Sequence, residues 1–377
     1  MLVVAGEASA DSHGARLVRA VHELAPEVSF RGIGGPLMAE AGVDVLVPAS
    51  DTAVVGLTEV FSKLGRIRNA SRMLKRILHR DPPDLLLLLD YPEFNLNLAG
   101  TARRCGVPVL YYIGPQVWAW RRNRLRKIAA RVDHMAVILP FEEPFYREAG
   151  VPVTYVGHPL LEEIPGFIRP DQSLRELGVE PGRTVLGLLP GSRDQEVANL
   201  LPPMLRAAEI LKGLYPDLVC VVPAASTVSP GLIEGPAAGS SAEVILWRGG
   251  VHRMLPACRA VLVASGTATL EAALHCVPTV VAYRVSQVSY YAGRALIRIP
   301  YISLVNLVAG EAVVPELIQH RVTPGNLARE AARIMEDGRS REKMVNGLKS
   351  VGERLGSAGA SGRTAAIALE MIKRRKR

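Results

Sequence analysis

The chain has 377 residues, of which 49% are hydrophobic and 21% are charged, and its formal net charge at pH 7 is +9. This length favours two domains, and the hydrophobic content is sufficient for a core in each. The run Leu85–Leu89 is far too short to cross a bilayer, so any membrane contact must be peripheral. The positive charge indicates a phosphate-bearing partner, which could be nucleic acid, an anionic lipid or a phosphorylated substrate.

The four cysteines form neither a disulfide framework nor a metal pattern. No CxxC pair occurs, and no cysteine or histidine stands at zinc-binding spacing. Met1 leads directly into an apolar, strand-like stretch with no visible signal peptide. We therefore expect a reduced, cytoplasmic protein without a structural metal.

Short apolar runs alternate with longer amphipathic stretches along the chain. The runs predict strands at 2–5, 85–89, 107–112, 134–139, 153–156, 184–189, 218–222, 244–246, 260–263 and 279–282. The stretches 14–24, 67–79 and 201–214 are typical of helices. This alternation predicts an α/β protein with doubly wound parallel sheets.

A stretch with three prolines, between Gly157 and Pro170, interrupts this alternation, and a new strand pattern starts at Thr184. We place the domain linker there, which gives Rossmann-like domains at 1–165 and 166–349. The helical segment at about 350–377 is expected to pack back on the first domain. We expect the ligand in a cleft between the domains, at the carboxyl ends of the strands.

Two turns in the second half have the composition of phosphate-binding turns. Ser192 and Arg193 follow one strand, and Ser265, Gly266 and Thr267 follow another, each directly before a helix. A helix N-terminus offers backbone N–H groups to an anion, and Arg193 adds a guanidinium fork. In the second turn Ser265 or Thr267 can cap the helix, and Gly266 lets a ligand approach the backbone. For the first turn, an ordinary strand-to-helix turn with a capping serine is the alternative.

Glu271 lies one helical turn after Thr267, where a carboxylate can accept hydrogen bonds from ribose hydroxyls. The alternative is an acidic residue favoured there by the helix dipole. Two anion-binding turns and a ribose-binding carboxylate together predict a nucleotide diphosphate site.

The first half carries acidic residues after its strands. Glu7, Ser9 and Asp11 follow the first strand, where the absence of a GxGxxG motif argues against a dinucleotide site. The acidic Glu7 and Asp11 would repel a pyrophosphate, and they could instead bind sugar hydroxyls or act as bases. Asp90 and Glu93 follow the run Leu85–Leu89 and are candidates for a general base. The alternative for either is a residue that caps the next helix.

Trp118 and Trp120 precede a cluster of five basic residues at 121–127. They could stack on a base or sugar, anchor the core, or contact nucleic acid, but no nucleic-acid-binding motif accompanies them. The segment 61–80 has seven basic residues and no acidic one. As a helix it would have an apolar and a basic side, and it could lie on an anionic membrane or pack on the sheet.

The chain resembles the bacterial lipid-A-disaccharide synthase family over nearly its full length. The order and spacing of several motifs make this resemblance specific. The motifs are Gly6-Glu7-Ala8-Ser9, Pro115-Gln116-Val117-Trp118-Ala119-Trp120, Leu139-Pro140-Phe141-Glu142, Val156-Gly157-His158-Pro159, Leu188-Leu189-Pro190-Gly191-Ser192-Arg193, Ser265-Gly266-Thr267-Ala268-Thr269-Leu270-Glu271 and Val305-Asn306-Leu307.

The resemblance implies a GT-B architecture and an inverting transfer from UDP-2,3-diacylglucosamine to 2,3-diacylglucosamine 1-phosphate. It implies that this chemistry needs no metal or other cofactor, and that the enzyme acts at the inner face of the inner membrane. It also implies a homodimer whose subunits could exchange C-terminal segments. In this scheme Ser192, Arg193, Ser265–Thr267 and Glu271 bind UDP, and Asn306 orients the substrate. Glu7, Ser9, Asp11 and Trp118 are the candidate acceptor-binding residues.

Two positions depart from the family pattern. Ala10 replaces a glycine, and Glu93 stands where a second aspartate is common, so the base is either Asp90 or Glu93. Two other functions remain open on the residues alone. One is another GT-B UDP-GlcNAc-dependent transferase or epimerase, and the other is a non-enzymatic nucleotide- or RNA-binding protein, although we expect no nucleic-acid partner.

Overall fold

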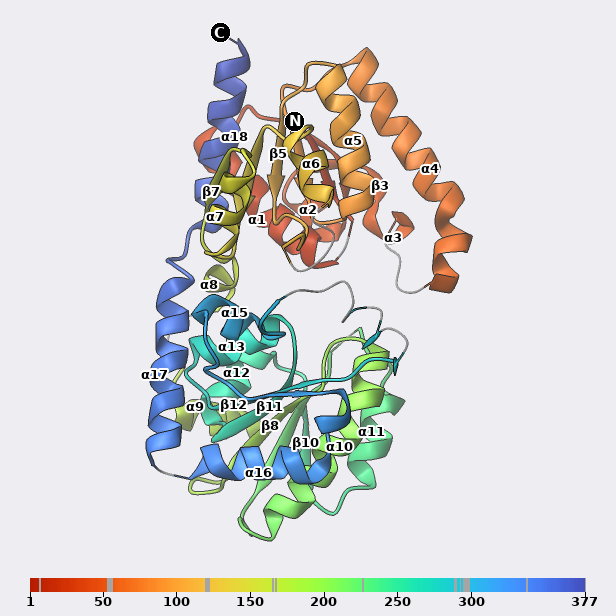
Figure 1. Ribbon diagram of the computed structural model, residues 1–377. Helices are drawn as coiled ribbons and strands as arrows, with labels where there is room; N and C mark the ends of the chain where they lie inside the picture. Colours follow the sequence, from red (N-terminus) through yellow and green to blue (C-terminus); the bar gives the residue numbers. More distant parts are fainter. Residues whose placement is uncertain are drawn as a thin grey trace. The chain divides into compact units, whose positions relative to one another are not determined.

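The computed structural model describes residues 1–6, 8–52, 57–118, 123–164, 166, 168–225, 227–287, 290–291, 293, 299–336 and 338–376. The chain divides into two compact units (Figure 1). The first unit comprises Met1–Glu163 and Ser357–Arg377, and the second comprises Ile164–Gly356. The chain therefore leaves the first unit once and returns to it for the last helix.

The first unit is built on a seven-stranded parallel sheet with the order β3-β2-β1-β4-β5-β6-β7. Every residue of β1, β4 and β5 is buried, as expected for a parallel sheet covered on both faces. The direction of strand addition reverses between β1 and β4, and such a reversal is where α/β sheets commonly bind ligands. The strands are β1 (Leu2–Ala5), β2 (Phe30–Gly34), β3 (Val43–Pro48), β4 (Leu86–Leu89), β5 (Val109–Tyr112), β6 (His134–Val137) and β7 (Val153–Tyr155).

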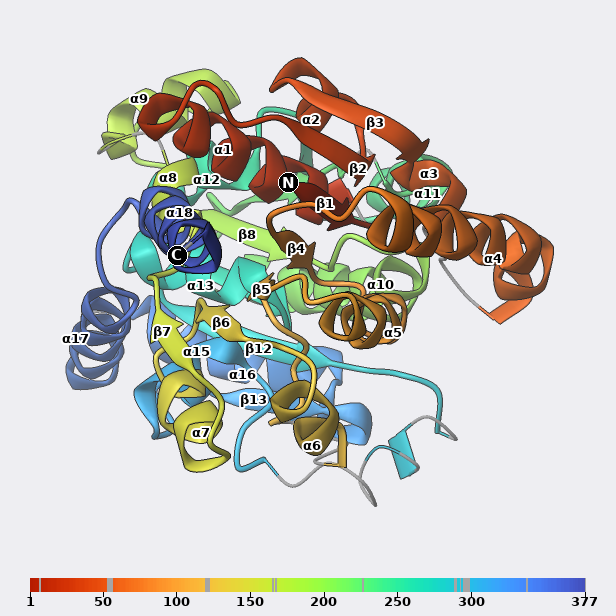
Figure 2. The ribbon, with the colours of Figure 1, turned by 90° about the horizontal axis from the view of Figure 1, so that it is seen from above.

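Helices cover both faces of this sheet (Figure 2). One face packs against α1 (Ala8–Leu24), α2 (Pro36–Glu40) and α18 (Ala360–Lys376). The other packs against α4 (Leu57–Arg80), α5 (Pro92–Arg104), α6 (Asn123–Ala129) and α7 (Glu142–Glu148). The short helices α3 (Ala49–Thr52) and α8 (Leu160–Glu163) complete the unit.

The basic segment 61–80 forms most of α4, as its pattern predicts. Leu74 and Leu78 are fully buried against the sheet, whereas Arg72, Arg76 and Arg80 are exposed. The apolar side of the helix therefore serves the core of the protein, and its basic side faces solvent.

The second unit is built on a six-stranded parallel sheet with the order β10-β9-β8-β11-β12-β13. Strand addition reverses between β8 and β11, so the carboxyl ends of these two strands flank the crevice of this sheet. The strands are β8 (Val185–Leu189), β9 (Val219–Pro223), β10 (Glu243–Trp247), β11 (Ala260–Ala264), β12 (Thr279–Tyr283) and β13 (Glu316–Ile318).

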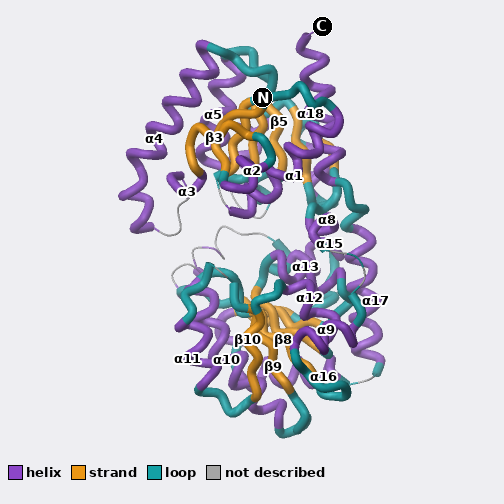
Figure 3. Tube along the Cα trace, turned by 180° about the vertical axis from the view of Figure 1, so that it is seen from behind, coloured by secondary structure: helices purple, strands orange, loops and turns teal. Residues whose placement is uncertain are grey.

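The helices of the second unit pack in two groups (Figure 3). One contains α10 (Asp194–Lys212), α11 (Gly231–Ala238) and α16 (Pro324–Met335). The other contains α9 (Pro170–Leu177), α12 (Val251–Met254), α13 (Thr267–Leu274), α15 (Leu304–Ala309) and α17 (Arg339–Arg354). Within the described part of the chain, no helix combines the length and apolarity needed to cross a membrane.

Candidate functional site

A pocket of about 450 Å³ lies at the strand-order reversal of the second sheet. The turns after β8 and β11 both contribute to its wall. The structure thus brings together all six residues that were predicted to bind the nucleotide in these two turns and the helix that follows. The lining includes Ser192, Arg193, Ser265, Gly266, Thr267 and Glu271.

The turn after β8 is fixed by Glu196, in the first turn of α10. Its carboxylate accepts hydrogen bonds from the Ser192 backbone N–H at 3.1 Å and from Arg193 Nη1 at 3.2 Å. Gly191 has φ = 118°, and a Cβ there would lie 2.3 Å from a carboxylate oxygen of Glu196. Glycine is therefore required at Gly191, and Arg193 is held beside the pocket although its side chain is 70% exposed.

Both helices that start at the pocket leave their N-terminal backbone N–H groups without a side-chain cap. The N-cap residue of α10 is Arg193 and that of α13 is Gly266, and neither makes a side-chain cap hydrogen bond. The expectation that Ser265 or Thr267 caps α13 is therefore wrong. Two uncapped helix N-termini with positive partial charge create a favourable environment for a pyrophosphate.

The hydroxyl group of Ser265 instead donates to the carbonyl oxygen of Ile302 at 3.0 Å. The Ile302 backbone N–H is held at 2.9 Å by Glu316, which also accepts from Asn306 Nδ2 at 2.9 Å. The side chain of Asn306 is buried, and its Oδ1 accepts from the backbone N–H groups of Val313 and Val314. Asn306 does not line the pocket, so its contacts suit an indirect role, through the loop that positions Ser265.

Trp247 and Gly250 also line this pocket, and sequence reasoning missed them. Trp247 ends β10, and its indole Nε1 donates to the Gly250 carbonyl oxygen at 2.7 Å. This bond fixes the ring at the carboxyl edge of the sheet, where an aromatic face can stack on a planar base. A tryptophan at a strand end, followed after Arg248 by two glycines, was the available sequence signal.

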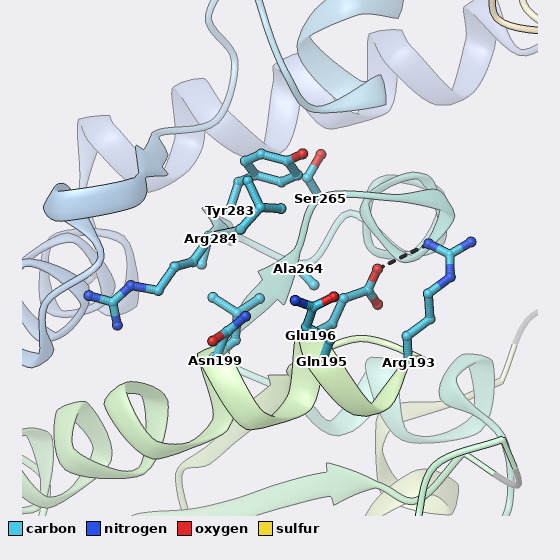
Figure 4. A pocket seen from close by; sticks show the side chains of 11 residues that line it. Arg193, Gln195, Glu196, Asn199, Ala264, Ser265, Tyr283 and Arg284 are labelled. Carbon is cyan, nitrogen blue, oxygen red and sulfur yellow. Dashed lines mark hydrogen bonds and ion pairs between the residues drawn. The ribbon is translucent and has the colours of Figure 1, made fainter. Parts of the chain in front are cut away.

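A second pocket of about 310 Å³ shares Arg193, Glu196, Ala264 and Ser265 with the first. Figure 4 shows Gln195, Glu196 and Asn199 along α10, with Tyr283 and Ser265 across from them. The segment after Tyr283 is fixed by Gln319, which exchanges two hydrogen bonds with the Val285 backbone at 2.8 and 3.0 Å. Gln319 has φ = 52°, an unfavourable conformation for a non-glycine residue that is typical of functional sites.

In the first unit, Asp90 follows β4 at the strand-order reversal, with strained backbone around it. Asp90 and Tyr91 have φ values of 45° and 50°, and Ile113, after β5, has φ = 56°. The Asp90 carbonyl oxygen accepts from Asn95 Nδ2 at 2.6 Å and from the Tyr111 hydroxyl group at 2.5 Å. These bonds hold Asp90 in a conformation that costs energy, which marks it as a candidate functional residue.

Glu93 has different surroundings. It lies in the first turn of α5, its side chain is 71% exposed, and it forms an ion pair with Arg124. Asp90 is half-buried, so the two candidate bases differ in exposure. The strained backbone segment includes Asp90 but not Glu93.

Of the predicted acceptor-binding residues, Ser9, Asp11 and Trp118 are described by the structure and differ in exposure. Glu7 lies outside the described residues, and Ser9 is exposed in the first turn of α1. Asp11 is 5% exposed, and its carboxylate accepts from the backbone N–H groups of Gly35, Leu37 and Met38 at 2.8–3.1 Å. Asp11 thus stabilises the N-terminus of α2, a contact that the sequence did not reveal.

Trp118 is held by Glu142, a buried carboxylate. Its indole Nε1 donates to Glu142 at 3.0 Å, and the backbone N–H groups of Ile138 and Leu139 donate at 3.3 and 3.0 Å. Burial raises the pKa of Glu142 to about 7, and the three donors oppose this rise. Trp118 also contacts Phe141 edge-on, with ring centroids 4.9 Å apart. Trp120 lies outside the described residues.

We expect the Glu142→Gln substitution to lower the unfolding free energy by about 1–3 kcal/mol, because an amide NH₂ group would face an N–H donor in place of a carboxylate oxygen. Since the folded state holds the Glu142 proton more tightly, the contribution of this group to stability declines as pH rises from about 4.5 to about 7. That dependence should vanish in the variant. Urea unfolding followed by tryptophan fluorescence measures both effects.

The control is Glu143→Gln in the same helix. Glu143 forms an ion pair with Arg147 at 2.9 Å, with the Arg147 side chain 67% exposed. This substitution should change the unfolding free energy by less than about 0.5 kcal/mol. Equal effects of the two substitutions would contradict the assigned role of Glu142.

Known proteins resemble the chain in both sequence and fold. The family model named Lipid-A-disaccharide synthetase matches residues 1–369. The lipid-A-disaccharide synthase of Geobacter sulfurreducens is 48% identical over 372 residues, covering 99% of this chain and 97% of that protein. The S. aureus MnaA–UDP co-structure has a TM-score of 0.64 at 14% identity, covering 96% of this chain and 93% of that one.

The calicheamicin glycosyltransferase CalG4 has a TM-score of 0.61 at 18% identity, covering 99% of this chain and 97% of that one. Identities this low establish the fold alone. With the two parallel sheets, they confirm the predicted GT-B architecture of two Rossmann-like domains.

Proposed function

Because this chain belongs to the lipid-A-disaccharide synthase family, and is therefore a glycosyltransferase of lipid A biosynthesis, we propose that it joins UDP-2,3-diacylglucosamine to 2,3-diacylglucosamine 1-phosphate. The products are a β-1,6-linked tetraacyl disaccharide 1-phosphate and UDP. The second unit binds the donor, and the first unit binds the acceptor.

The observation that carries this proposal is the pocket between the two uncapped helix N-termini of the second sheet. Its lining residues suit UDP. The pyrophosphate lies against Ser192, Arg193 and the turn Ser265–Thr267, and Glu271 accepts hydrogen bonds from the ribose. Trp247 stacks on the uracil. The adjoining pocket of about 310 Å³ then receives the glucosamine ring, since it shares Arg193 with the nucleotide pocket.

The leaving group departs as a UDP anion. Arg193 is bound to Glu196 in the present structure, and a pyrophosphate with more negative charge would compete for its guanidinium group. Together with the α10 and α13 N-termini, Arg193 stabilises the charge that develops when the bond from the anomeric carbon to the UDP oxygen breaks.

The acceptor base in this proposal is Asp90. Its carboxylate takes the proton of the acceptor 6-hydroxyl group as that oxygen forms a bond with the anomeric carbon, from the face opposite the departing UDP. The attack inverts the anomeric carbon. The strained backbone of Asp90 and its place at the strand-order reversal favour it over the exposed, ion-paired Glu93.

The lipid substrates place the reaction at the inner face of the inner membrane, where the enzyme binds peripherally. The exposed basic side of α4 is the proposed contact with anionic headgroups, since Arg68, Arg72, Arg76 and Arg80 all face solvent. A homodimer is also proposed, on the family resemblance alone.

UDP release by the purified chain tests the function. With both diacylated substrates we expect turnover that requires each of them, and a disaccharide product that mass spectrometry identifies. UDP-GlcNAc and unacylated glucosamine 1-phosphate should be poor substrates, because they lack the acyl chains. Efficient turnover without acyl chains, or epimerisation of UDP-GlcNAc, would instead indicate one of the other GT-B activities.

A further inference from the structure

The first unit also carries a basic pocket of about 610 Å³. It lies at the end of the sheet where the strands begin, opposite the end at which Asp90 lies. Asp90 follows the carboxyl end of a strand, whereas this pocket is lined by residues at the amino ends of β5, β6 and β7. Because the strands are parallel, the two sites lie at opposite ends of the strands. Arg103, from the end of α5, and Arg374 and Arg375, from the end of α18, also line the pocket.

The charges around this pocket are unbalanced. Three arginines line it with a single carboxylate, Asp133. That carboxylate is already bound, because it pairs with Arg103 at 3.3 Å and accepts from the Val109 backbone N–H at 2.8 Å. Arg374 pairs with Glu370 on its own helix, and Arg375 donates to the Pro83 carbonyl oxygen. Each guanidinium group has five N–H donors, so these contacts leave further donors for an anion.

His134, on the pocket wall, is sensitive to this positive charge. Its Nε2 lies 2.9 Å from the Thr154 hydroxyl oxygen. Burial lowers the pKa of His134, the positive charge of Arg374 lowers it further, and Glu370 acts in the opposite direction. An anion bound beside Arg374 would raise this pKa, so His134 is a built-in reporter of occupancy.

We propose that this pocket binds a phosphate group, either that of a membrane lipid headgroup or that of a soluble phosphate ester. Arginines from two helices far apart in sequence line it, and guanidinium groups favour phosphate oxygens. Arg375 also ties α18 to the segment that follows α4, whose basic side is exposed. The site does not depend on the donor pocket or on the proposed sugar transfer.

The first experiment follows the NMR titration of the His134 ring in the full-length chain, assigned with a His134→Gln variant. Adding inorganic phosphate in place of chloride at constant ionic strength should raise the pKa of His134 by about 0.5 or more. Arg374→Gln should remove most of this rise. The matched control is Arg206→Gln, which changes an equally exposed helical arginine of the second unit and should leave the rise intact.

The second experiment separates the two sources of phosphate by sedimentation with vesicles. Binding to phosphatidylcholine vesicles that contain phosphatidylglycerol, weakened about tenfold by Arg374→Gln, would assign the site to lipid headgroups. A His134 response to glycerol 3-phosphate, with vesicle binding equal in the variant and the native chain, would assign it to soluble esters. A His134 pKa that neither phosphate, glycerol 3-phosphate nor vesicles shift, or that Arg206→Gln affects as much as Arg374→Gln, would overturn the proposal.

Discussion

Replacing Asp90 with Asn is expected to lower kcat on the order of 100- to 10,000-fold, because the amide cannot accept the proton of the acceptor hydroxyl group. The KM for the UDP-sugar should change little, since the proposed donor pocket lies within the second unit. Asn tolerates the left-handed conformation that Asp90 adopts at φ = 45°, so the strained turn should survive. Steady-state kinetics with both lipid substrates measures the effect.

Glu93→Gln is the matched comparison, three residues along the same segment. Because Glu93 is exposed and paired with Arg124, we expect its loss to reduce kcat less than about fivefold, in keeping with the small contribution of a surface ion pair. If Asp90→Asn kept a near-native kcat and Glu93→Gln lost most of its kcat, Glu93 and not Asp90 would be the base.

Arg193→Ala is expected to lower kcat on the order of 100-fold, because it removes a cation from the charge that develops on the departing UDP. Arg193→Lys should recover part of this loss, since a lysine keeps the charge but not the fork geometry. Isothermal titration with UDP, beside the kinetics, tells weakened binding from weakened transition-state stabilisation.

Arg206→Ala is the control for this prediction. Arg206 lies in α10, whose N-cap residue is Arg193, and it also pairs with a glutamate three residues on, at 3.1 Å. It does not line the proposed donor pocket. Its loss should leave kcat and UDP affinity unchanged within about twofold. If Arg193→Ala behaved in the same way, Arg193 would have no role in the departure of UDP.

Most strands could be predicted because they are buried on both faces. The runs at 2–5, 85–89 and 260–263 are apolar throughout, and the parallel strands β1, β4 and β11 lie there. The strands β2, β3 and β13 were missed. β2 contains an arginine and two glycines, β3 lies at a sheet edge and is half exposed, and β13 has only three residues. β2 and β13 have no apolar run longer than two residues, and the run Val45–Val47 of β3 lies between Asp44 and Pro48.

The meeting of Ser192 and Arg193 with the segment Ser265–Glu271 in one pocket could be predicted, because these residues follow directly after strands β8 and β11. In a parallel sheet such turns share one edge, so sequence position alone brings them together. The contacts of Asp11 with α2, of Glu142 with Trp118 and of Gln319 with Val285 could not be predicted in this way. Each joins segments whose pairing follows from tertiary packing, and no local pattern encodes it.

The return of α18 to the first unit imposes an order on folding during synthesis. Ala360, Ala365 and Ala368 are buried in the core that includes residues of α1. The ribosome therefore releases the opening strands and helices of the first unit long before the helix that covers them. The second unit is continuous in sequence, so it can fold while the face of the first sheet that α18 covers is still exposed. The first unit is therefore the first to be synthesised and the last to be completed. An apolar surface of the nascent chain stays exposed for most of translation.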